Sequence, residues 1–193
     1  MKKVLLAAAL MISSVAAFAQ HAVGTVTIQP KVGLNIANFT DADDADARVG
    51  FVAGAEFEYQ VSDIFSLSAG ALYSQQGCKG KEGGLSLTQK LDYINVPVMA
   101  NVYVAPGFAV KLGVQPGFKV NAEAEAKSGS NRITAGDSEN FNSVDFSIPV
   151  GVSYEFNNVV LDARYNWGLT NVAKNADNKN SVFQFTVGYK FAL

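Results

Sequence analysis

The chain has 193 residues, enough for one domain with a full core or for one closed barrel, and short for two independent domains. Only 17% of its residues are charged and 49% are hydrophobic, and its formal net charge of −2 argues against the basic face that a nucleic-acid partner requires. The single cysteine, Cys78, rules out an internal disulfide framework, and we expect it to be an unpaired thiol in a loop.

The N-terminal segment has the pattern of an export signal. Lys2 and Lys3 precede an apolar run over residues 4–18, and the small residues before Gln20 predict cleavage after Ala19. We therefore expect residues 1–19 to be a signal peptide and residues 20–193 to form the mature domain. The only histidine, His21, would then lie in a flexible tail ahead of the first strand.

Eight segments alternate apolar and polar residues with the period of a β-strand that separates two media. In chain order they are residues 26–36, 49–59, 65–74, 93–104, 108–120, 144–155, 161–172 and 183–191. An even number of such strands is typical of single-chain barrels of the outer membrane.

The segments between these strands alternate in length. Short turns are expected at residues 60–63, 105–107 and 155–158, and long polar loops at residues 38–47, 77–90, 121–143 and 171–180. Membrane barrels have this asymmetry, with turns in the periplasm and loops outside the cell.

Alternation alone does not say which face is outside, because a soluble lipocalin-like barrel shows the same period with its apolar face inward. The polar face here consists mostly of Gly, Ser, Asn, Gln and Thr, which suit a crowded interior better than a water-exposed surface. Several segments also approach the length that a tilted strand needs to cross a bilayer. The sequence therefore predicts an all-β, eight-stranded, antiparallel up-and-down transmembrane barrel, with a soluble carrier as the alternative.

Charged residues on the predicted inner face need partners, because an unpaired charge in a narrow lumen is costly. We expect Arg164 and Lys111 to pair with carboxylates in a structural network that fills the barrel. The candidate carboxylates are Glu56, Glu58, Asp145 and Asp162. Side chains fill the interior of an eight-stranded barrel, so a general diffusion pore is not expected.

Five stretches resemble an outer-membrane β-barrel family that includes PorT-like proteins and is similar in architecture to the small OmpA and OmpX barrels. They are KVGLNIANF, GFVAGAEFEYQVSDIFSLSAGALYSQQG, LDYINVPVMANVY, LDARYNWGLTNV and SVFQFTVGYKF, in this order along the chain. The resemblance implies location in the outer membrane of a double-membraned bacterium, contact with its lipid, and insertion by the barrel-assembly machinery. It implies no defined activity, because members of such families are functionally diverse and some are linked to protein secretion.

The residues do not predict an enzyme. No catalytic, cofactor-binding or metal-binding set is expected, since the single histidine precedes the first strand and the acidic segment at residues 41–46 lacks the spacing of a calcium loop. We expect a non-enzymatic barrel with a structural or surface-contact role through its external loops. The alternative is an accessory component of a secretion or assembly complex, with a protein partner at the loops or turns.

Overall fold

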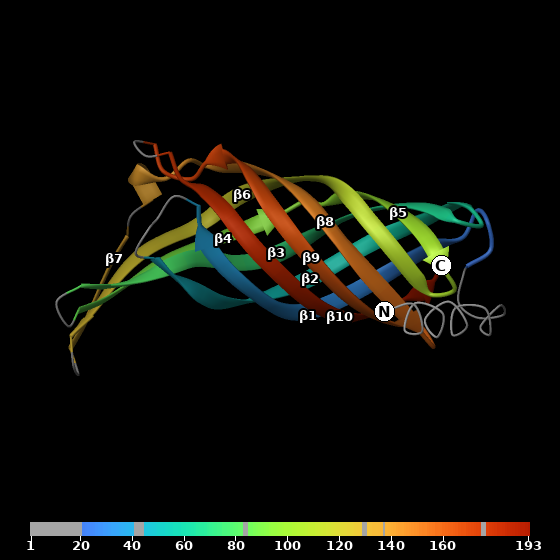
Figure 1. Ribbon diagram of the computed structural model, residues 1–193, viewed down its shortest axis with the longest axis horizontal. Coiled ribbons are helices and arrows are strands. Elements are labelled where there is room, and N and C mark those ends of the chain that lie inside the picture. Colours follow the sequence, from blue (N-terminus) through green and yellow to red (C-terminus); the bar gives the residue numbers. More distant parts are fainter. Residues whose placement is uncertain (1–20, 41–44, 83–84, 129–130, 137, 175–176) are drawn as a thin grey trace, which may run out of the picture.

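Antiparallel strands make up nearly all of the described structure (Figure 1). The computed structural model describes residues 21–40, 45–82, 85–128, 131–136, 138–174 and 177–193. The elements are β1 (Val26–Phe39), β2 (Ala45–Ser62), β3 (Phe65–Glu82), β4 (Leu85–Asn95), β5 (Val98–Ala105), β6 (Phe108–Ser128), β7 (Asn131–Gly136), the short 3-10 helix η1 (Ser138–Asn140), β8 (Val144–Phe156), β9 (Val159–Asn171), β10 (Lys179–Tyr189) and β11 (Phe191–Ala192). No helix in the described part of the chain is long and apolar enough to cross a membrane.

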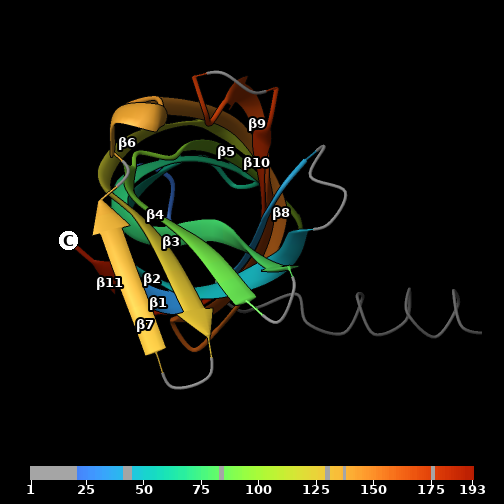
Figure 2. The same cartoon turned by 90° about the vertical axis from the view of Figure 1, so that its left-hand side faces the viewer.

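These strands close into a ring of eight. β4 and β5 are two halves of one strand, since both pair with β3 and with β6, and they separate at Pro97, which has no N–H to give to a neighbour. β10 and β11 likewise both pair with β1. The β1–β10 pairing, from Lys31 opposite Gly188 to Phe39 opposite Asn180, closes the ring, and Figure 2 shows it along its axis. The predicted eight-stranded antiparallel barrel is confirmed.

The apolar side of each strand faces outward. On β9, Leu161 and Trp167 are 59% and 56% exposed, whereas Asp162 and Arg164 between them are buried. The same holds around the ring, with Leu112 on β6 exposed and Lys111 beside it buried. A water-soluble carrier would have the opposite arrangement, so the lipocalin-like alternative is wrong.

The predicted short turns lie at the end of the barrel that holds the C-terminus (Figure 1). Asn157 and Asn158, between β8 and β9, have φ angles of 48° and 67°, which two-residue hairpins of type I′ require and which asparagine tolerates. Between β5 and β6, Gly107 follows Pro106 and has a φ of 71°, as in a type II turn.

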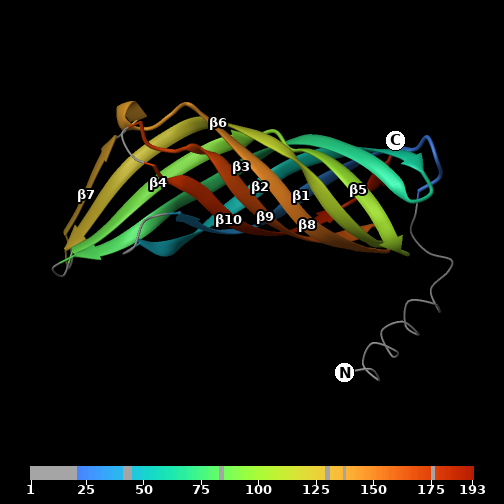
Figure 3. The ribbon, with the colours of Figure 1, turned by 45° about the horizontal axis from the view of Figure 1, so that its top comes forward.

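Two of the predicted long loops are largely strand. β3 continues to Glu82, β4 begins at Leu85, β6 continues to Ser128, and β7 pairs with β6, so the loops expected at residues 77–90 and 121–143 are wrong. We call residues 77–82, 85–91, 122–128 and 131–136 the external sheet, which extends beyond the other strands at the end opposite the C-terminus (Figures 1 and 3). Cys78 consequently lies within β3 and not in a loop.

Candidate functional site

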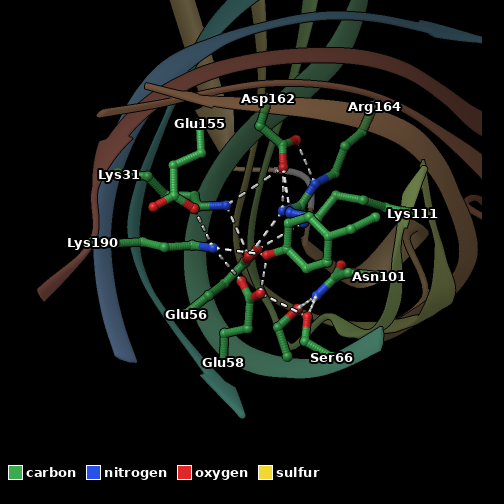
Figure 4. A network of polar contacts seen from close by, with 12 residues as sticks. Lys31, Glu56, Glu58, Ser66, Asn101, Lys111, Glu155, Asp162, Arg164 and Lys190 are labelled. Carbon is green, nitrogen blue, oxygen red and sulfur yellow. Dashed lines mark hydrogen bonds and ion pairs between the residues drawn. The ribbon is translucent and has the colours of Figure 1, made fainter. Parts of the chain in front are cut away.

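Arg164 is at the centre of a buried ionic cluster in the lumen (Figure 4). Its guanidinium donates from Nη1 and Nη2 to the two carboxylate oxygens of Glu56, at 2.7 and 2.8 Å, and from Nε to Asp162 Oδ1 at 2.6 Å. Glu56 lies on β2, which is not a neighbour of β9 in the ring, so the bidentate pair spans the interior of the barrel. Planar guanidinium groups favour this two-point contact with carboxylates.

Two lysines complete this cluster from other strands. Lys31 Nζ on β1 lies 2.8 Å from Glu56 Oε2 and 3.8 Å from Asp162 Oδ2. Lys111 Nζ on β6 lies 2.8 Å from Asp162 Oδ2. The carboxylates of Glu56 and Asp162 are therefore shared among three cations, Arg164, Lys31 and Lys111. All five side chains point into the lumen, as the alternation of their strands predicts.

A second cluster lies nearer the short turns. Lys190 Nζ is 3.0 Å from Glu58 Oε2 and 2.8 Å from Glu155 Oε2. Tyr103 donates its hydroxyl proton to Glu58 Oε1 at 2.5 Å and accepts a hydrogen bond from Lys190 at 3.1 Å. His21 Nε2 lies 3.3 Å from Glu155 Oε1, so His21 contacts this end of the lumen and the expectation of a flexible tail is wrong.

The six residues expected in the lumen separate into three groups. Glu56, Lys111, Asp162 and Arg164 lie together, and Glu58 belongs to the second cluster. Asp145 lies apart from both clusters and accepts hydrogen bonds from Thr170 at 2.7 Å and Asn180 at 3.0 Å.

Sequence reasoning missed three charged members of the clusters. Each occupies an inward position of a predicted strand, so the alternation itself could have identified it. They are Lys31, Glu155 and Lys190. With them the two clusters hold four Lys or Arg side chains and four carboxylates, and this balance removes the uncompensated charge that would make burial costly.

Glycines opposite the large inward side chains provide the space that these side chains occupy. Gly151 on β8 is opposite Arg164, and a Cβ at Gly151 would lie 2.4 Å from the Ala163 carbonyl oxygen and 2.9 Å from Arg164 Cγ. We expect Gly151→Ala to lower the free energy of unfolding by about 1–3 kcal/mol, because the backbone must shift to relieve this contact. Denaturant titration of the refolded barrel in detergent measures the change. Gly136→Ala on β7, where a Cβ meets nothing within 4 Å, is the matched control and should leave stability nearly unchanged.

A cluster of buried apolar side chains lies toward the external end of the barrel. Its members are buried side chains near the outer ends of the strands and on the following loops, namely Phe39, Leu91, Tyr93, Ala122, Phe141 and Val172. Cys78 packs against them. Among the described residues, the interior is thus occupied by ionic groups toward the short turns and by apolar groups toward the outside.

The remaining expected features lie partly outside the described residues. Ala19 and Gln20, at the predicted cleavage site, are not among them, and neither are residues 41–44 of the acidic segment. Within the described ranges, no group of three or more His, Cys, Asp or Glu side chains is placed to hold a metal ion.

An apolar outer belt, a charged and filled lumen, short turns at one end and a strand extension at the other define a transmembrane β-barrel. The profile of the outer membrane protein beta-barrel domain family matches residues 18–174, and the chain belongs to this family of outer-membrane proteins. No curated protein sequence matches the chain.

Solved structures of other outer-membrane proteins share the fold. Ail, the attachment invasion locus protein of Yersinia pestis, superposes with a TM-score of 0.54 at 15% identity, over 88% of this chain and 99% of Ail. Ail in complex with the heparin analogue sucrose octasulfate gives a TM-score of 0.51 at 14% identity over the same shares. Neisserial surface protein A superposes with a TM-score of 0.52 at 17% identity, over 86% of this chain and 97% of that protein. At these identities the similarity shows the fold alone.

Proposed function

We propose that this protein is a non-enzymatic surface-contact protein, in which the barrel is a rigid membrane anchor and the external sheet makes contact outside the cell. One observation carries the proposal: β3, β4, β6 and β7 continue as an ordered sheet beyond the apolar belt, while the described lumen is filled. A filled barrel is suited to holding the sheet in place and not to passing solutes.

The edge of the external sheet gives this contact a physical basis. β7 pairs with β6 and with no other strand of the described chain, so its far edge leaves backbone groups without strand partners. Such an edge can accept an added strand or hydrogen-bond to a flat polar surface. The name of Ail, which shares the fold, refers to attachment, and this agrees with a contact role.

The ionic clusters of the lumen belong to the anchor function in this proposal. Arg164, Glu56 and Asp162 link β9 to β2 across the interior, and Lys31 and Lys111 add β1 and β6. Ion pairs and hydrogen bonds between strands that are not neighbours oppose changes in the shape of the barrel.

Vesicles that carry the purified protein test the proposal by their adhesion to cultured animal cells and to bacterial cells. We expect shortening the external sheet, by replacing residues 79–88 and 125–134 with tight turns, to lower adhesion at least fivefold without loss of the folded barrel. A variant shortened at residues 173–178 is the control. Adhesion no greater than that of empty vesicles on both cell types would contradict the proposal, and a stoichiometric envelope partner recovered by crosslinking would favour the secretion or assembly role expected of PorT-like proteins.

A further inference from the structure

Residues 21–25, which we call the N-terminal turn, fold against the short-turn end of the barrel ahead of β1. Gly24 has a φ of 88°, the left-handed conformation that glycine adopts without strain. Its N–H donates to the Gln60 carbonyl oxygen on β2 at 2.8 Å, and the Gln60 N–H donates to the Thr25 carbonyl oxygen at 3.0 Å. The backbone of the N-terminal turn is thus tied to β2 on one side, and His21 lies at its other end.

The side chain of His21 lies at the mouth of the lumen and is 18% exposed. Its Nε2 is 3.3 Å from Glu155 Oε1 on β8. The other strands bring three more titratable groups to this mouth, namely Lys190 after β10, Glu58 on β2 and Tyr103 on β5. His21 therefore extends the second ionic cluster toward the solvent.

The charges at this mouth balance only when His21 is protonated. Glu58 and Glu155 carry two negative charges and share one cation, Lys190. The cluster around Arg164 has one cation more than it has carboxylates, but among the described residues the ion pairs of Glu155 are with Lys190 and His21 alone. The Glu155 side chain is only 4% exposed, and a carboxylate so far from water needs a cationic partner, which an imidazolium provides.

We propose that the N-terminal turn is a pH-dependent latch on the lumen, closed by protonated His21 and released when His21 is neutral. Histidine changes its charge between about pH 5 and 8. At the acidic end of this range the imidazolium pairs with Glu155 and holds the turn against the mouth. As the pH rises this charge is lost, and the hydrogen bonds to Gln60 that remain are between neutral groups, which contribute less than a charge-assisted contact.

Release of the latch exposes Glu155 and Lys190 to water. In outer-membrane barrels the short turns face the periplasm, so the latch responds to the pH of that compartment. The inference concerns the end of the barrel opposite the external sheet and does not rest on the proposed surface contact.

Electron paramagnetic resonance of a nitroxide label at position 23 reports whether the N-terminal turn is held. Val23 is 57% exposed, so Val23→Cys accepts the label without loss of a buried contact, and Cys78→Ser in the same chain removes the only native thiol. Lipid nanodiscs leave both ends of the barrel open to the buffer. We expect the ratio of immobilised to mobile label to fall at least fivefold between about pH 5 and pH 8.

Substitutions at the ion pair separate His21 from other causes of pH dependence. His21→Gln and Glu155→Gln should leave the label mobile at both pH values, because neither variant can form the pair. His21→Lys keeps a cation at both pH values and should leave the label immobilised at both. A label at Ile64→Cys, in the turn between β2 and β3 and of similar exposure, should not respond to pH.

Three results would overturn the proposal. The first is a pH response that persists in His21→Gln, and the second is a label immobilised to the same extent at both pH values when His21 is present. The third is a label that stays mobile at both pH values in His21→Lys. Heat-modifiable migration of every variant verifies that the barrel is folded.

Discussion

Arg164→Met is expected to lower the free energy of unfolding by about 3–5 kcal/mol, because it removes the hydrogen bonds that Arg164 donates to the buried carboxylates of Glu56 and Asp162. Methionine fills much of the volume of arginine but offers no donor. Lys31 and Lys111 still contact the two carboxylates, yet the clusters as a whole lose one of four cations. The fluorescence of Trp167, the only tryptophan and a lipid-facing residue of the same strand, follows unfolding in denaturant.

Two further variants distinguish the ionic explanation from a general loss of packing. Arg164→Lys keeps the charge but cannot form the bidentate contact, so we expect a loss intermediate between wild type and Arg164→Met. Arg132→Met removes the same kind of side chain from the exposed external sheet and should change stability by no more than about 0.5 kcal/mol. An unfolding midpoint of Arg164→Met equal to that of wild type would show that the lumen cluster does not stabilise the barrel.

The strands, and the face of each strand that points outward, were predictable because both follow from the boundary between lipid and lumen. A strand between lipid and lumen must alternate, as β9 does, with Leu161 outward and Asp162 inward. The many small polar residues on the inner face then indicate which side is enclosed, because they leave the space that large inward side chains such as Arg164 occupy.

The alternation of a strand shows which side chains point into the lumen, but not how far along the barrel axis each one lies. The partners inside the lumen were therefore only partly predictable. Arg164 and Glu56 are 108 residues apart and meet across the barrel. Their relative height depends on the register summed around the ring, including the β1–β10 closure, and on the space left by residues such as Gly151. The sequence therefore placed Asp145 among the candidates although it lies apart from the clusters, and the charge on Lys190 was missed.

The external sheet escaped prediction for a different reason. Outside the membrane an outward side chain does not face lipid and need not be apolar, so the alternation of residues 77–90 becomes irregular. The segment is rich in Gly and Lys, a composition typical of loops. Strand pairing there is extended from the barrel below: β3 and β4 leave the belt in register, and β4 and β6 remain paired beyond a register shift between Asp92 and Tyr93. Tertiary context, and not local propensity, forms this sheet.

Leu112→Arg is expected to destabilise the barrel in lipid vesicles by about 2–4 kcal/mol, the cost of a cation near the middle of a bilayer. Leu112 lies near the middle of the apolar belt on β6, between Ala100 and Val150 on the neighbouring strands, and is 56% exposed. Unfolding in denaturant from vesicles measures the loss.

The depth dependence of this cost separates the membrane environment from simple packing. Phe156→Arg changes an even more exposed side chain, at the β8–β9 turn, where an arginine reaches the interface, so its cost should be about 0–1 kcal/mol. A barrel surrounded by water would tolerate both changes alike, because neither side chain is buried by protein. Equal effects at the two positions would therefore contradict the assignment of the outward row through Leu112 to the hydrocarbon core, whereas a difference that follows depth can arise only if lipid surrounds this wall.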